Sequence, residues 1–230
     1  MIDTKVPLLR RVRRIAGRLI FTLLALAVPG ALGSAGATPP IPEISSTIDF
    51  CSSCHGPDGR STSPQFPRLA GQRADYIAAQ LQAFRNDTRT APHAQDYLNY
   101  LVMWGLTAQL NAPTTDAIAA YYASQTPASG TQAASAQIAA GARIYAEGVP
   151  SQGIPACVAC HGPRAQGSPP IPGVTGQSPV PRLAGQYQAY LARQLEVFRI
   201  WARQNVMMHT ISVGLTPEQI DDVTAYLATL

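Results

Sequence analysis

Apolar side chains recur along the chain with the spacing of helices that bury one face. Two segments, 76–84 and 190–198, place apolar residues at positions i, i+1, i+5 and i+8, which line one side of a helix. No segment alternates apolar and polar residues clearly enough to predict a strand. The chain is therefore expected to be all-α.

A further helix is expected at the C-terminus. It is expected to begin after Thr216, whose side chain can cap it. Pro217 fits the first helical position, and Gln219 completes a capping box with Thr216. The apolar residues Ile220 and Val223 continue it at helical spacing.

The chain repeats itself. Four strings recur in the same order, and their first copies are CSSCHGPDG at 51–59, PRLAGQ at 67–72, YIAAQLQAFR from Tyr76 and DAIAAYYAS from Asp116. Such ordered matches indicate two homologous domains. We assign them to residues 38–127 and 134–230, joined by the Ser/Gly/Ala-rich linker 128–133.

The first 37 residues have the layout of a secretory signal peptide, with five arginines between positions 10 and 18, an apolar run at 19–28 and small residues at 35–37. An uncleaved membrane anchor is the alternative, although the run is shorter than the roughly 20 residues of a spanning helix.

Removal of this leader changes the charge of the protein. The leader carries six of the 17 Lys and Arg residues and one of the 13 Asp and Glu residues, so the formal charge of +4 becomes −1 in the remainder. The remaining arginines are scattered. No basic surface for nucleic acid is therefore expected.

All four cysteines lie in two C-x-x-C-H strings. Two thiols at this spacing can form thioether bonds to both vinyl groups at one edge of a haem, and the adjacent histidine can bind its iron. Two covalently attached haem c groups are therefore expected, held by Cys51, Cys54 and His55 and by Cys157, Cys160 and His161.

Other uses of paired cysteines fit less well. A disulfide framework would not need a histidine after each second cysteine. A zinc ribbon would combine the two pairs, whereas each pair belongs to its own repeat. A thioredoxin-like redox motif would follow a strand, and neither copy does.

Met103 and Met208 are the candidates for the sixth iron ligand. When the final helices are aligned, each methionine lies seven residues before a matching leucine, Leu110 or Leu215. A thioether ligand raises the reduction potential of haem. The expected iron ligands are therefore His55 with Met103 and His161 with Met208.

Competing ligands exist in both repeats. Met207 competes with Met208, and His93 competes with Met103. His209 is expected to point away from the iron beside its neighbour.

These residues resemble the cytochrome c4 family, di-haem cytochromes that are soluble or membrane-associated. The resemblance covers about residues 43–230 and is carried by CHGPDG, by FPRLAGQ at 66–72, by GARIYAEGVPSQGIPACVACHGP at 141–163 and by the methionine before a G-L-T-P-E-Q helix start. It implies two tandem class I cytochrome c domains, each a few helices wrapped around a covalent haem.

The resemblance also implies roles for the PRLAGQ strings. In the family the proline carbonyl accepts a hydrogen bond from the iron-bound imidazole, and the leucine packs on the porphyrin. The corresponding residues are Pro67 and Leu69 in the first repeat and Pro181 and Leu183 in the second.

Two features depart from the family pattern. The opening helix of the first repeat is shortened to about 44–50 and lacks a counterpart of Gly141, where the first and last helices would cross closely. The first repeat is also longer between its leucine and its methionine, with 34 residues from Leu69 to Met103 against 25 from Leu183 to Met208.

The resemblance implies a periplasmic one-electron carrier between a quinol-oxidising cytochrome bc complex and a haem-copper terminal oxidase, with possible peripheral association with the membrane. The alternative is the haem subunit of a periplasmic dehydrogenase. A di-haem peroxidase would need an open iron position, against which two matched methionines argue.

We predict that the protein is exported through the general secretory route and that its mature chain begins near Thr38. Haem attachment follows translocation, and no clear twin-arginine consensus follows the arginine cluster. Mass spectrometry of the purified holoprotein measures the N-terminus and the haem count together. An intact leader on membrane-bound holoprotein would contradict cleavage.

Overall fold

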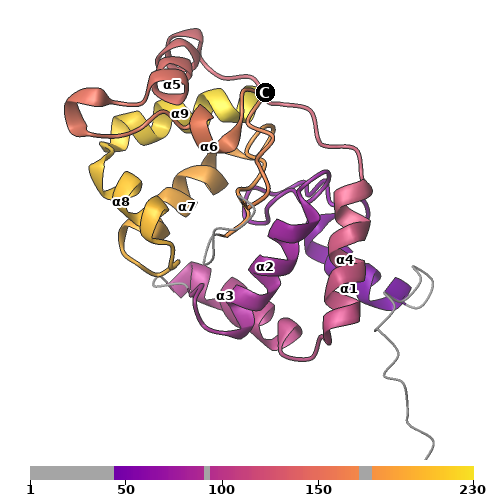
Figure 1. Ribbon diagram of the computed structural model, residues 1–230. Coiled ribbons are helices and arrows are strands. Elements are labelled where there is room, and N and C mark those ends of the chain that lie inside the picture. The colour runs from indigo at the N-terminus through magenta and orange to yellow at the C-terminus, as the bar shows by residue number, and fades with distance from the viewer. Residues whose placement is uncertain (1–43, 91–93, 171–177) are drawn as a thin grey trace, which may run out of the picture. The chain divides into compact units, whose positions relative to one another are not determined.

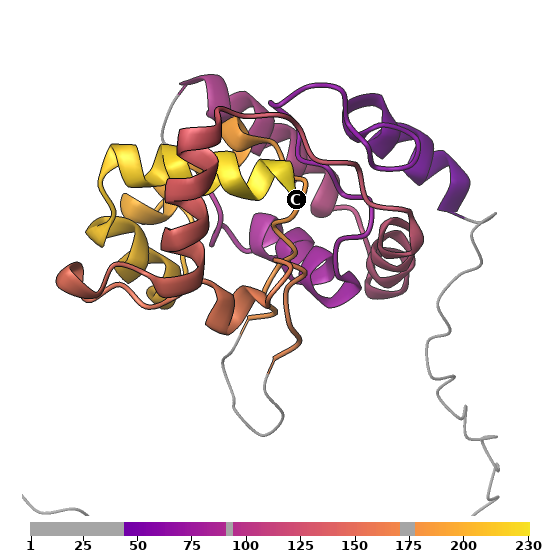
Figure 2. The same cartoon turned by 90° about the horizontal axis from the view of Figure 1, so that it is seen from above.

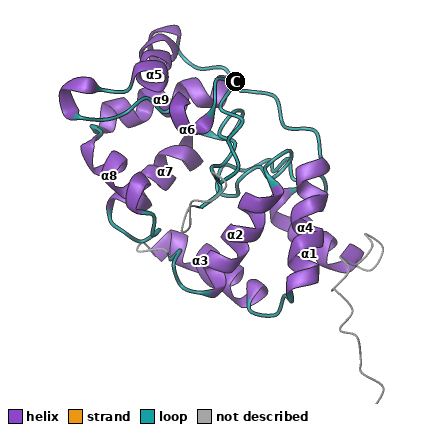
Figure 3. Cartoon of the chain, in the orientation of Figure 1, coloured by secondary structure: helices purple, strands orange, loops and turns teal. Residues whose placement is uncertain are grey.

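The computed structural model describes residues 44–90, 94–170 and 178–230, with the backbone alone for 94–97. These ranges consist of helices and loops and contain no strand (Figures 1 and 3), only three isolated bridges. The predicted all-α class is confirmed. The leader and His93 lie outside the described residues.

The described residues of the first repeat form the helices α1 (Ser45–His55), α2 (Ala74–Arg85), α3 (Ala94–Thr107) and α4 (Ala112–Ser124). Helix α2 contacts both α3 and α4. The core is built from apolar faces of α1, α2 and α4, with Ile44, Ile48, Ile77, Ala117, Ile118, Ala119 and Tyr122 buried.

In the second repeat, the opening helix and the helix of the cysteine motif are separate elements. Its elements are α5 (Ser135–Glu147), the 3₁₀ turn η2 (Pro150–Gln152), α6 (Val158–His161), α7 (Gln188–Arg199), α8 (Val206–Gly214) and α9 (Pro217–Thr229). Its main core combines α5, α7 and α9 with the loop after the cysteine motif, through Tyr145, Ala165, Ala184, Leu191, Val223 and Leu227.

The expected start of the last helix is confirmed. Thr216 Oγ1 accepts from the Gln219 N–H at 3.2 Å, and Gln219 Oε1 accepts from the Thr216 N–H at 2.9 Å. These bonds satisfy two backbone donors that the helix itself leaves unpaired. Ile220 and Val223 then bury the inner face of α9.

The predicted end of the opening helix near residue 50 is wrong. Helix α1 continues through Cys51 and Cys54 to His55. In the second repeat, residues 148–156 separate α5 from the cysteine motif. The first repeat has no such insertion, so its opening helix and its motif helix are one element.

Both repeats belong to one compact unit. Within the described ranges, no helix is both long and apolar enough to span a bilayer. The domain boundaries at 127 and 134 remain predictions from the sequence.

Helices α5 and α9 lie against each other in both views (Figures 1 and 2). They meet at Gly141, where an added Cβ would lie 2.0 Å from the Asp222 carbonyl oxygen and 2.8 Å from Tyr226 Cβ. The close crossing predicted at Gly141 is thus confirmed. A methyl group there would force the two backbones apart.

We predict that Gly141→Ala lowers the free energy of unfolding by about 1–3 kcal/mol, because overpacking strains a close contact. Gly105→Ala is the matched control: it lies inside α3 with open space around it, so it should raise stability by about 0.5–1 kcal/mol. Denaturant unfolding of the holoprotein measures both. A parent-like Gly141→Ala variant would contradict the close crossing.

Candidate haem sites

The first cysteine motif lies on the last two turns of α1. Cys51 and Cys54 are three residues apart on one helix, which places both thiols on the same side. All four cysteines are free of disulfides. Both thiols of the first motif are therefore available for thioether bonds, and the disulfide alternative is not supported.

His55 follows directly and is buried. Its Nδ1 lies 3.0 Å from the Pro67 carbonyl oxygen. A carbonyl can only accept, so Nδ1 carries the proton and Nε2 keeps its lone pair. Burial, the largest cause, lowers the pKa of His55 and favours the neutral imidazole that binds iron.

The second motif repeats this geometry. His161 is buried and its Nδ1 lies 3.1 Å from the Pro181 carbonyl oxygen. Burial again lowers the pKa of the imidazole. The structure therefore brings each histidine together with the proline predicted for it, across 12 residues in one repeat and 20 in the other.

Backbone hydrogen bonds hold the proline segments in place. Leu69 N–H donates to the Gly59 carbonyl at 2.7 Å, and Leu183 N–H donates to the Ala165 carbonyl at 2.8 Å. Both leucine side chains pack at the edge of their repeat's core. Their predicted contact with the porphyrin remains a prediction.

Both candidate methionines are half-buried residues of helices, Met103 of α3 and Met208 of α8. Met103 on α3 is half-buried, whereas its neighbours Val102 and Trp104 are 52% and 43% exposed. Met208 on α8 is also half-buried, whereas Met207 is 60% exposed. This contrast favours Met208 over Met207 as the ligand.

His209 is engaged away from this position. Its Nδ1 lies 2.9 Å from the Phe198 carbonyl oxygen, and its ring meets the edge of Trp201 with centroids 4.7 Å apart. His93, the rival in the first repeat, lies outside the described residues.

The donor set fits haem c rather than a protein-bound metal ion. Each repeat offers two thiols and one neutral imidazole, and burial raises the pKa of Cys51 and brings that of Cys157 to about 11. Among the described side chains no cluster of three or more His, Cys, Asp or Glu residues forms.

Arg89 and Arg203 form a cluster of cations that the sequence pattern did not indicate. Arg203 donates to Gln80 and Gln194 at 2.6 and 2.7 Å, and Arg89 donates to the same glutamines at 2.9 and 3.2 Å. Neither has a carboxylate partner among the described residues. Arg203 is buried and Arg89 is half-buried. A buried cation without a counter-ion is costly, and an acidic group of a bound haem would offset that cost.

Comparison with known proteins agrees with this geometry. The family model for cytochrome c matches the chain twice, at residues 45–126 and 138–230. Cytochrome c-552 of Acidithiobacillus ferridurans is 37% identical over 92% of this chain and 86% of its own. Cytochrome c4 of Azotobacter vinelandii is 34% identical over 91% of this chain and 96% of its own.

Two further matches bear on fold and function. The thiosulfate dehydrogenase electron acceptor of Thiomonas intermedia (strain K12) is 34% identical over 90% of this chain and 89% of its own. The crystal structure of reduced recombinant cytochrome c4 from Pseudomonas stutzeri superimposes with a TM-score of 0.70 at 31% identity, covering 83% of this chain and 98% of that chain.

We predict that both irons are low-spin with His and Met ligands. Thioether coordination to ferric haem gives a weak far-red charge-transfer band that bis-His haem lacks. Met208→Ala should remove about half of this band and lower one of the two potentials, because a methionine ligand raises the potential. Met103→Ala should remove the other half.

Met207→Ala and His93→Ala are the matched controls, and both should leave the band unchanged. A wild-type band of one haem's intensity, together with no effect of Met103→Ala, would show that the first iron lacks the predicted methionine. Met207 is the neighbouring methionine on α8 and is 60% exposed, so Met207→Ala controls for the loss of a methionine that does not bind iron.

Proposed function

Because the chain belongs to the cytochrome c4 family, we propose that it carries single electrons in the periplasm from a cytochrome bc complex to a haem-copper terminal oxidase. The chain is an electron-transfer protein with two tandem cytochrome c domains and two covalent haem c groups. The named donor, acceptor and compartment are the proposal.

One observation carries this proposal: each domain buries a neutral histidine whose Nδ1 is fixed on a proline carbonyl. The thioether bonds at Cys51 and Cys54, and at Cys157 and Cys160, would hold each haem permanently. Haem iron supplies the one-electron couple. If Met103 and Met208 bind the irons as predicted, neither iron has an open position for a substrate, which suits a carrier and not a peroxidase.

The chain's own residues set the conditions for electron transfer. The proline carbonyl orients each imidazole and increases its basicity. His55 and His161 are both buried, which limits the rearrangement of water around these ligands when the charge of iron changes. The expected −1 charge of the mature chain, made more negative by the propionates, suits partners with basic docking surfaces.

Thiosulfate dehydrogenase is the second candidate electron donor. The Thiomonas intermedia relative bears the name of an electron acceptor of that enzyme and matches 90% of this chain. The same two haem sites could accept electrons from either donor. The two candidates therefore differ only in which protein reduces the haems. Peripheral membrane association is part of the first proposal, because both of its partners are membrane complexes.

We predict that the oxidised holoprotein is reduced rapidly by membranes containing a cytochrome bc complex and quinol, and that a haem-copper oxidase reoxidises it. Stopped-flow absorbance of the haems measures both steps. An inhibitor of the bc complex should abolish the reduction. Cys157→Ala should bind one haem only and take up half as many electrons.

Thiosulfate dehydrogenase with thiosulfate is the comparison donor. Fast reduction by this pair and slow reduction by the bc complex would favour the second candidate. Slow reduction by both donors would contradict both candidates, while the haem count and ligand spectra would remain as assigned.

A further inference from the structure

Each domain places one buried glutamine against the loop that fixes the other domain's histidine. Gln72 and Gln186 end the two PRLAGQ strings, and each is only 7% exposed. Gln186 Oε1 accepts from the Arg68 N–H at 3.0 Å, and its Nε2 donates to the Arg68 carbonyl at 2.9 Å. The contact therefore joins a side chain of the second domain to the backbone of the first.

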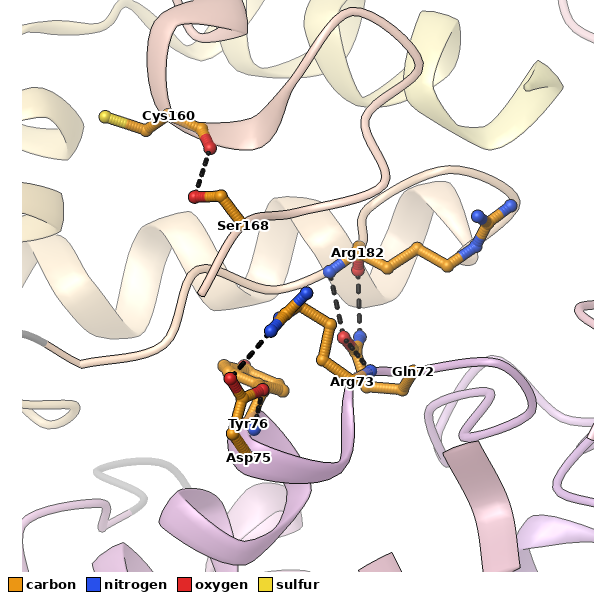
Figure 4. A network of polar contacts seen from close by, with 7 residues as sticks. All are labelled: Gln72, Arg73, Asp75, Tyr76, Cys160, Ser168 and Arg182. Carbon is orange, nitrogen blue, oxygen red and sulfur yellow. Dashed lines mark hydrogen bonds and ion pairs between the residues drawn. The ribbon is translucent and has the colours of Figure 1, made fainter. Parts of the chain in front are cut away.

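Gln72 makes the same pair of bonds in the opposite direction. Its Oε1 accepts from the Arg182 N–H at 2.8 Å, and its Nε2 donates to the Arg182 carbonyl at 2.9 Å (Figure 4). The two glutamines form a reciprocal exchange between the domains, and every bond uses the backbone of the partner arginine.

The orientation of both amides is fixed by a second donor. Gln72 Oε1 also accepts from the Arg73 N–H at 3.0 Å, and Gln186 Oε1 also accepts from the Tyr187 N–H at 3.1 Å. A flipped amide would place its NH₂ group against two N–H donors, which cannot bond to it. Each oxygen therefore faces the arginine N–H.

This N–H belongs to the peptide group that fixes the histidine. The Pro67 carbonyl and the Arg68 N–H are two ends of one planar peptide unit. Its oxygen accepts from His55 Nδ1 at 3.0 Å, and its N–H donates to Gln186. In the other domain the Pro181–Arg182 peptide joins His161 to Gln72 in the same way.

Hydrogen bonds linked through one peptide unit strengthen each other. Donation from the peptide N–H increases the negative charge on its carbonyl oxygen. A stronger acceptor at Nδ1–H makes the imidazole a more basic ligand. A more basic ligand favours ferric over ferrous iron, so each glutamine should lower the potential of the haem in the opposite domain.

We propose that Gln186 is a positioning residue for His55 and that Gln72 is one for His161, so that each domain tunes the reduction potential of the other domain's haem. The inference rests on haem attachment at both motifs. It does not depend on which protein delivers or accepts the electron.

The test is a redox titration of the holoprotein followed by NMR of the haem methyl groups, assigned to each domain through contacts with its residues. Gln186→Met keeps the side-chain length and removes both hydrogen bonds to Arg68, together with the bond from the Tyr187 N–H. At a fixed ambient potential it should raise the ferrous-to-ferric ratio of the N-terminal haem about threefold, or about 30 mV. Gln72→Met should do the same to the C-terminal haem.

The Nδ1 proton resonance of the opposite histidine is a second readout, and it should move upfield as its hydrogen bond weakens. Gln188→Met is the matched control, because Gln188 donates at 3.3 Å to Asp221 within its own domain. It should change neither potential.

A shift confined to the mutated domain, an equal shift of both haems, or no shift would overturn the proposal. Should Gln186→Met fail to hold two haems, Gln186→Glu decides, because it keeps an oxygen toward the Arg68 N–H. It should lower the potential of the N-terminal haem more than that of the C-terminal haem, and any other result contradicts the proposal. Partner assays do not enter this test, so failure of the proposed pathway is recognised separately.

Discussion

A buried imidazole that binds iron through one nitrogen needs a fixed partner for the other, and both domains are organised around this requirement. The partner is a proline carbonyl, which approaches His55 and His161 at nearly the same distance. Burial keeps the rings neutral. The loop that carries the proline must therefore return to the end of the motif helix, and the Leu69 and Leu183 backbone bonds hold it there.

Proline suits this position because its carbonyl is needed and an N–H is not. The next N–H in the chain, that of Arg68 or Arg182, is left to find a partner inside the protein. The glutamine of the opposite domain provides it. The PRLAGQ string thus supplies both the carbonyl that accepts from the histidine of its own domain and the glutamine that bonds to the other domain. Two copies of the string can therefore form an interdomain contact without further residue types.

The sequence predicted what depends on local chemistry. The capping box at Thr216 follows from side chains three residues apart, and the haem sites follow from the spacing of Cys51, Cys54 and His55. It did not predict the interdomain contact of Gln72, because a glutamine beside a loop is ordinarily solvated and its partner, Arg182, lies 110 residues away. The signal for Gln72 was the repetition of the whole PRLAGQ string, from which roles were predicted for the proline and leucine alone.

The same duplication leaves the two sites electrostatically unequal. The Arg68 guanidinium donates to the Gly185 carbonyl at 2.6 Å and lies over the Tyr187 ring at 4.0 Å. Burial lowers the pKa of Arg182, and its guanidinium makes no hydrogen bond to the described residues. A cation fixed beside the first proline segment and a poorly solvated one beside the second create different fields at the two histidines. Two irons with the same predicted histidine and methionine ligands would therefore differ in potential, and one repeated fold is compatible with a directional electron step between the two haems.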